Sequence, residues 1–155
     1  MADHSHTYAR NRKAGFDIEV QEKYEAGIVL TGDEIKSIRS GRMQLSGSYV
    51  KLMRGHSKQG GLPEVVLIGM NLSQAAKPDR TRRLLLHARE VETLTRALEA
   101  KGKVAVPLSL YFKRGWAKVS VGVGVGRRQY DKRELLRKRE GERSQERELK
   151  GIRRP

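Results

Sequence analysis

Apolar and polar residues alternate along much of the N-terminal half, which is the pattern of half-buried β-strands. From Phe16 to Leu30 the alternation predicts one long strand, with a bend at Glu22 where the pattern breaks. Two shorter strands are expected over 48–53 and 64–72, because a glycine-rich turn separates them. The N-terminal half is therefore expected to consist mainly of sheet.

The C-terminal half carries the strongest hairpin pattern of the chain. Apolar residues alternate over 104–112 and again over 117–125. The segment between them, Lys113-Arg114-Gly115, has the composition of a tight turn. Two long antiparallel strands are predicted here.

Two segments show helical signals instead. Thr31-Gly32-Asp33-Glu34 has the spacing of a capping box and Gly41 can end a helix, so a short helix is predicted over 33–40. A longer helix is predicted over 88–101, where apolar residues recur at helical spacing and Gly102 supplies the end.

These elements favour a mainly β fold. Five or six strands, with one long helix before the last hairpin, suggest a small antiparallel barrel of the oligonucleotide-binding type with accessory α-helices. A split sheet packed on one helix is the alternative. The barrel is expected over 16–126, preceded by a flexible basic N-terminal arm over 1–15, where no periodicity is sustained.

The last segment, 127–155, differs in composition from the rest. It holds 12 Lys and Arg, 6 Asp and Glu, and few apolar residues, which is too little to form a core. Helix formers are common in it, but a lone helix is marginal in water. We expect a basic C-terminal tail that is disordered alone and becomes helical on a polyanionic surface.

The charge balance indicates the class of partner. The chain of 155 residues has 33 Lys and Arg against 18 Asp and Glu, a formal net charge of +15, so polyanions are attracted and nucleic acid is the expected ligand. No run approaches the ~20 apolar residues of a membrane-spanning helix. The absence of cysteine excludes disulfides and thiolate metal sites. A cytoplasmic, monomeric protein with no membrane association is expected.

The excess basic residues are spread over four clusters, which suits a large folded RNA contacted on several sides. These are Arg10, Arg12 and Lys13; Arg80, Arg82 and Arg83; Lys113 and Arg114; and the tail. Four aromatic side chains can either stack on exposed bases or pack at the barrel rim. They are Tyr8, Tyr49, Tyr111 and Trp116.

Catalytic and cofactor motifs are not found in the sequence, so no enzyme activity, cofactor or metal is expected. His4 and His6 would make a poor metal site, and the carboxylates Glu25, Asp33 and Glu34 lack a recognisable acid/base companion. Glycines at every second position over 121–126 do not fit a dinucleotide loop; they leave one strand face bare for packing or for an RNA backbone.

Several motifs in this order resemble the SsrA-binding protein (small protein B) family, from Asn11 to about Lys150. They are Asn11-Arg12-Lys13-Ala14, Tyr24-Glu25-Ala26-Gly27-Ile28-Val29-Leu30-Thr31-Gly32-Asp33-Glu34-Ile35-Lys36-Ser37, Ser48-Tyr49-Val50, Arg82-Arg83-Leu84-Leu85-Leu86-His87, Pro107-Leu108-Ser109-Leu110-Tyr111-Phe112-Lys113 and Tyr130-Asp131-Lys132-Arg133.

The resemblance implies a barrel that binds the tRNA-like domain of transfer-messenger RNA (tmRNA) and delivers it to the decoding centre of stalled ribosomes, the process of trans-translation. It implies that the tail becomes helical on the ribosome, where it enters the decoding centre and the message channel. Together with the basic clusters, it gives an expected RNA-binding set of Asn11, Arg12, Lys13, Glu25, Arg82, Arg83, Leu84, Lys113 and Arg114. The expected ribosome-contacting set is Gly126, as a flexible joint, with Arg127, Arg128, Asp131, Lys132 and Arg133.

Glu25 needs a separate explanation, because a carboxylate does not bind phosphate. We expect it to hold a basic neighbour in position or to accept a hydrogen bond from a base or ribose.

Two other functions remain as alternatives to tmRNA binding. One is a different basic barrel of the oligonucleotide-binding type, such as a ribosomal protein or translation factor, and the other is an RNA-modifying enzyme. Selective binding of the tRNA-like domain would distinguish a tmRNA-binding protein from another basic barrel. RNA turnover would indicate an enzyme.

Overall fold

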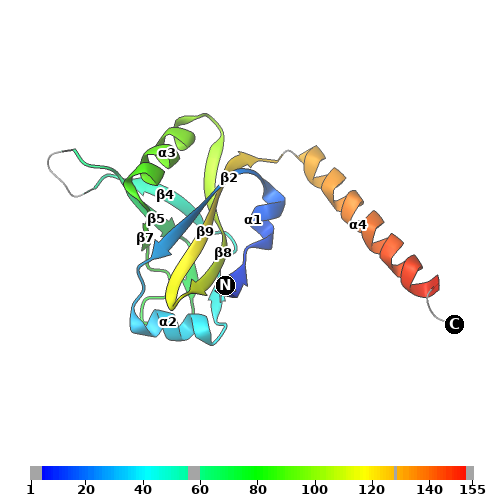
Figure 1. The fold of residues 1–155 in the computed structure, drawn as a ribbon, viewed down its shortest axis with the longest axis horizontal. Coiled ribbons are helices and arrows are strands. Elements are labelled where there is room, and N and C mark those ends of the chain that lie inside the picture. The colour runs from blue at the N-terminus through cyan, green and yellow to red at the C-terminus, as the bar shows by residue number, and fades with distance from the viewer. Residues whose placement is uncertain (1–4, 56–59, 128, 153–155) are drawn as a thin grey trace.

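The computed structural model describes residues 5–55, 60–127 and 129–152 (Figure 1). Its elements, in chain order, are β1 (Ser5–Arg10), α1 (Arg12–Asp17), β2 (Ile18–Ile28), α2 (Gly32–Arg39), β3 (Met43–Gln44), β4 (Tyr49–Met53), β5 (Glu64–Ile68), β6 (Asn71–Leu72), β7 (Arg82–Leu85), α3 (Ala88–Glu99), β8 (Lys103–Lys113), β9 (Trp116–Gly126) and α4 (Gln129–Ile152). Within these residues no helix is both long and apolar enough to cross a membrane.

A seven-stranded antiparallel sheet forms the body of the protein, in the order β1-β8-β4-β5-β7-β2-β9. Because β8 also pairs with β9 along its length, the sheet closes into a barrel, as the strand pattern predicted. The closure is partial, because β2 pairs with β7 only at Gly27 and Ile28 and β4 pairs with β8 only at Val50. Helices α2 and α3 lie at opposite ends of the barrel (Figure 1).

The core lies inside this ring and under the two end helices. Ala26, Leu67, Leu110 and Val119 from four strands are fully buried, and Leu94 packs against them from α3. The hairpin of β8 and β9 turns at Arg114 and Gly115, which both have positive φ (52° and 81°). This is the backbone that a tight hairpin turn needs, so the predicted turn is confirmed.

The start of β2 differs from the prediction. The strand begins at Ile18 rather than Phe16, because Phe16 lies in α1. The cause is a helix cap: the Asn11 side chain accepts a hydrogen bond from the Ala14 amide (3.2 Å), and Ala14 packs outside the barrel against Val106. The bend expected at Glu22 is confirmed as a register shift between Val20 and Glu22.

The N-terminal segment also differs from the flexible arm expected over 1–15. Strand β1 pairs with β8 from Ser5↔Lys113 to Arg10↔Ser109, and α1 follows it. The pairing satisfies backbone groups at the edge of β8. Strand β1 is therefore determined by its partner strand, and the segment itself shows no periodicity from which it could be predicted. Residues 1–4, including His4, lie outside the described residues.

Glycines at every second position of β9 leave one face of the strand without side chains, either for packing or for an RNA backbone. Two of these glycines can be tested against their neighbours. A Cβ on Gly124 would stand 1.8 Å from the Glu19 carbonyl oxygen of β2, and one on Gly122 would stand 2.8 Å from the Leu108 side chain. Gly124 is therefore required by the close approach of the β2 backbone, whereas a Cβ on Gly122 would need only a shift of the Leu108 side chain. A Cβ on Gly126, at the end of the strand, would meet open space.

The tail forms α4, which projects away from the barrel (Figure 1). Its described side chains are mostly exposed, which agrees with a segment that has no core of its own. Its disorder in the isolated protein remains a prediction. Arg128 lies outside the described residues.

Candidate nucleic-acid interface

The strand registers bring polar, basic and aromatic residues together on the outer face of the barrel. Two neighbouring rows cross β1, β8, β9, β2 and, in the first row, β7. The first row is Thr7, Tyr111, Lys118, Gly27 and Leu85, and the second is Arg10, Ser109, Ser120 and Glu25. This face mixes cations with aromatic and apolar groups, which is the composition of a nucleic-acid-binding sheet.

A groove of about 770 Å³ runs along this face. Gly27 adds no side chain to it, while Leu85, Trp116 and Lys118 line it. Trp116 is 73% exposed and Leu85 is 51% exposed, so both present large apolar surfaces to solvent. An exposed indole beside a lysine offers a stacking platform for an unpaired base and a cation for its phosphate.

Glu25 lies at one side of the groove and is held by two neighbours on β8. Its carboxylate accepts a hydrogen bond from the Tyr111 hydroxyl and lies 3.7 Å from the Lys113 ammonium group. Glu25 thus does hold a basic neighbour, as its sequence context led us to expect. Since the carboxylate is partly exposed, it also has acceptor capacity left for a base or ribose.

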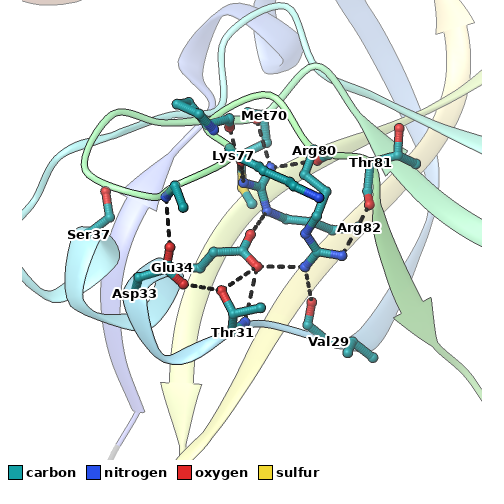
Figure 2. A network of polar contacts seen from close by, with 12 residues as sticks. Val29, Thr31, Asp33, Glu34, Ser37, Met70, Lys77, Arg80, Thr81 and Arg82 are labelled. Atoms are coloured by element: carbon teal, nitrogen blue, oxygen red, sulfur yellow. Dashed lines mark hydrogen bonds and ion pairs between the residues drawn. The ribbon is translucent and has the colours of Figure 1, made fainter.

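Arg82 is not on this surface, which corrects its prediction as an RNA-binding residue. Its side chain is 0% exposed and donates to Glu34 Oε2, to the Met70 carbonyl (2.9 Å) and to the Pro78 carbonyl (3.0 Å) (Figure 2). A guanidinium that is fully used inside the protein cannot reach a phosphate. Its neighbour Arg83 points outward and is exposed.

Glu34, in the first turn of α2, is the centre of this buried network. Its Oε1 accepts from the Thr31 amide (3.0 Å), which is half of the predicted capping box, and from Arg80 Nη2 (2.5 Å) (Figure 2). Burial alone would raise the pKa of Glu34, but the hydrogen bonds from Arg80, Thr31 and Arg82 outweigh it and lower the pKa. The network ties α2 to the loop that leads into β7.

Asn11 and Leu84 are also buried. The Asn11 side chain is 6% exposed, because it caps α1 and donates to the Pro107 carbonyl (2.9 Å). Leu84 faces the core, whereas Leu85 faces the groove. Asn11 and Leu84 are therefore too buried to contact RNA directly, which corrects their prediction as RNA-binding residues. Asn11 instead holds α1 in place, and Arg12 and Lys13 of that helix are exposed.

The remaining predicted residues are divided between two regions. Arg12, Lys13, Arg83 and Arg114 are exposed and Lys113 is partly exposed, all on the barrel. Gly126 and Arg127 lie at the joint, and Asp131, Lys132 and Arg133 lie in the first turns of α4. Leu85 and Lys118 were not in the expected RNA-binding set, and Arg10 was expected only as a member of a basic cluster, although strand alternation places each of them outward.

Among the residues that the structure describes, no three histidine or acidic side chains gather as metal ligands. His6 packs instead edge-to-face against Tyr8, with the ring centroids 4.5 Å apart. Tyr8 in turn packs against Phe112, so it belongs to the barrel and not to a stacking surface.

Comparison with known proteins agrees with this geometry. A sequence model of the SmpB protein family matches residues 8–151. The chain belongs to the SmpB family. An SsrA-binding protein of Geobacillus sp. (strain WCH70) is 45% identical over 146 residues, which is 90% of this chain and 89% of the relative. One from Gloeothece citriformis (strain PCC 7424) is 43% identical over 148 residues, which is 90% of each chain.

The fold of this SmpB-family chain also matches a solved structure. That structure is described as "tmRNA-SmpB: a journey to the center of the bacterial ribosome". It aligns with a TM-score of 0.60 and 37% sequence identity, over 83% of this chain and 94% of the other. The resemblance expected from the sequence motifs is therefore confirmed at the level of family and fold.

Proposed function

We propose that this protein binds the tRNA-like domain of tmRNA and delivers it to stalled ribosomes for trans-translation, acting in the cytoplasm without turnover of its own. The observation that carries the proposal is the groove at Gly27, where Leu85 and Trp116 are exposed and Lys118 supplies a cation. Membership of the SmpB family supports the identity of the RNA.

In this proposal the groove receives unpaired bases of a folded RNA. Trp116 stacks on a base, Lys118 pairs with a nearby phosphate, and the Glu25 carboxylate accepts a hydrogen bond from a base or ribose. Arg83 and Arg114 contact phosphates near the groove, and Arg12 and Lys13 contact phosphates at the other end of β2, where α1 packs; these contacts set the register of the RNA without reading its sequence. Recognition then depends on the shape of the RNA more than on any one base.

The tail would act in the second stage, on the ribosome. Its cations, from Arg127 and Arg128 onward, would pair with ribosomal RNA in the decoding centre and the message channel, which are vacant only when the message has ended. Asp131, Lys132 and Arg133 lie in the first turns of α4, where they would enter first. Gly126 would provide the flexible joint between the barrel and the tail, because a Cβ added there would meet no neighbouring atom.

A mobility shift with tmRNA and with a structured control RNA of equal length, at fixed moderate salt, tests the proposal. Trp116→Ala should weaken binding of tmRNA by about 5- to 150-fold, since stacking on an aromatic side chain contributes about 1–3 kcal/mol per base. Tyr49→Ala is the matched control, because Tyr49 is also exposed (47%) but lies on β4, outside the groove.

The outcomes separate the alternatives. Equal binding of tmRNA and control RNA by the unsubstituted chain would leave only a general basic RNA-binding barrel. An equal loss from Trp116→Ala and Tyr49→Ala would place the RNA elsewhere on the barrel. Degradation of either RNA would point to an enzyme.

A further inference from the structure

Asp17, the last residue of α1, contacts the joint between barrel and tail at two points. Its backbone carbonyl accepts a hydrogen bond from the Arg127 amide (2.8 Å), directly after β9 ends at Gly126. Its carboxylate Oδ1 lies 3.1 Å from the Lys132 ammonium group in the first turn of α4. One residue therefore binds both the end of the barrel and the start of the tail.

The surroundings of this contact favour an interaction within the chain over one with RNA. A cleft of about 550 Å³ beside it is lined by residues of both signs together with one leucine. They are Glu19, Arg127, Asp131, Glu134, Leu135 and Lys138. Three carboxylates repel a phosphate backbone, whereas the mixed charges suit the first turns of a helix lying against the start of β2.

We propose that Asp17 is a positioning residue for the tail: by holding Lys132 it sets the direction in which α4 leaves the barrel of the free protein. Both charged groups are partly exposed. An exposed ion pair shifts an equilibrium by up to about fivefold, so the contact orders the tail without fixing it permanently. Lys132 can then exchange the carboxylate for a phosphate once the tail reaches RNA.

That Lys132 exchanges the Asp17 carboxylate for a phosphate during delivery of the RNA rests on the proposed function of the tail. The contact between Asp17 and Lys132 in the free protein does not. The test therefore uses the free, full-length protein. Because the chain contains no cysteine, Lys51→Cys on β4 and Glu142→Cys on α4 accept one spin label each. Pulsed electron paramagnetic resonance then gives the distribution of distances between barrel and tail.

We expect a docked peak above the broad background of a tail that is otherwise disordered, and a broader distribution after Asp17→Asn or Lys132→Gln, because the docked population falls by up to about fivefold. The charge-swapped pair Asp17→Lys with Lys132→Asp should restore the docked peak. A merely structural role of Asp17 in α1 would not produce that rescue. Glu19→Gln, which removes the same charge from the neighbouring cleft, is the control and should leave the docked peak unchanged.

An unchanged distribution in Asp17→Asn, failure of the charge swap to restore it, or equal broadening by Glu19→Gln would each overturn the inference. Mobility shifts with tmRNA, run on the same variants, keep the two proposals apart. Non-selective RNA binding by the unsubstituted chain would refute the proposed function and leave the distance result standing.

Discussion

The buried network around Glu34 gives the sharpest prediction about stability. Glu34→Gln keeps the shape of the side chain but removes the charge that compensates Arg82, whose guanidinium is completely buried. Both oxygens of Glu34 accept hydrogen bonds, whereas the amide of glutamine has only one acceptor oxygen. In either orientation the N–H donors of the new amide therefore face the donors of Arg82 or of Arg80. Breaking a buried ion pair by removing one partner costs about 3–5 kcal/mol. That is a large share of the roughly 5–15 kcal/mol that holds a typical domain folded.

Arg80→Gln is the matched variant, since Arg80 donates to the same carboxylate but its side chain is 33% exposed. Its loss leaves Glu34 still paired with Arg82, so we expect a cost of about 0–1 kcal/mol, as for an exposed pair. Urea unfolding at neutral pH, followed by circular dichroism, measures both values. If the two variants lie within about 1 kcal/mol of each other, burial does not govern the strength of this network and the reasoning is refuted.

The same pair carries a pH dependence with a defined sign. The pKa of Glu34 is lower in the folded protein than its ordinary value of 4.5. The unfolded chain therefore binds the proton more readily, and the stabilisation is fully present above that ordinary value. It is lost as the pH falls through the lower, folded-state pKa, and Glu34→Gln should flatten this part of the stability profile.

Three further predictions concern other parts of the chain. Burial, the hydrogen bond to Glu22 and the charges of Glu22 and Glu90 raise the pKa of Tyr24 to about 12, so ultraviolet titration should show a late tyrosine component that Tyr24→Phe removes. Its stabilisation is present below about pH 10 and lost as the pH rises towards 12. A peptide of residues 127–155 should be mostly unstructured in water and gain helical circular dichroism with a polyanion; a stable helix in buffer would refute the expected disorder. Gly124→Ala should cost about 1–3 kcal/mol or more in urea unfolding, whereas Gly126→Ala should change stability by less than about 0.5 kcal/mol.

The features predicted well from the sequence are those that local patterns determine. Period-two alternation located the long hairpin of β8 and β9, and the break in that pattern at Glu22 located the bulge in β2. The capping-box spacing located α2 at Thr31. Each of these signals lies within a few residues of the structure it predicts.

The features missed depend on partners far away in the sequence. Asn11 caps α1, but the helix is fixed to the barrel by the hydrogen bond from Asn11 to the Pro107 carbonyl, 96 residues away. Strand β1 exists because β8 offers it an edge. The burial of Arg82 depends on Glu34, which lies 48 residues earlier, so the sequence alone placed Arg82 with Arg83 in a basic cluster that contacts RNA.

Strand alternation nevertheless contained the information that distinguishes Arg82 from Arg83. The four residues of β7 alternate between buried and exposed: Arg82 and Leu84 face inward, while Arg83 and Leu85 face outward. Extending the strand back from the leucines by two residues would have placed Arg82 in the core, where a buried carboxylate must then accompany it. The same step identifies Arg83 and Leu85 as the outward pair, which is the pair that reaches the proposed RNA surface. The net charge of +15 therefore overstates what RNA can contact, because an arginine that is buried and paired contributes to the fold and not to the interface.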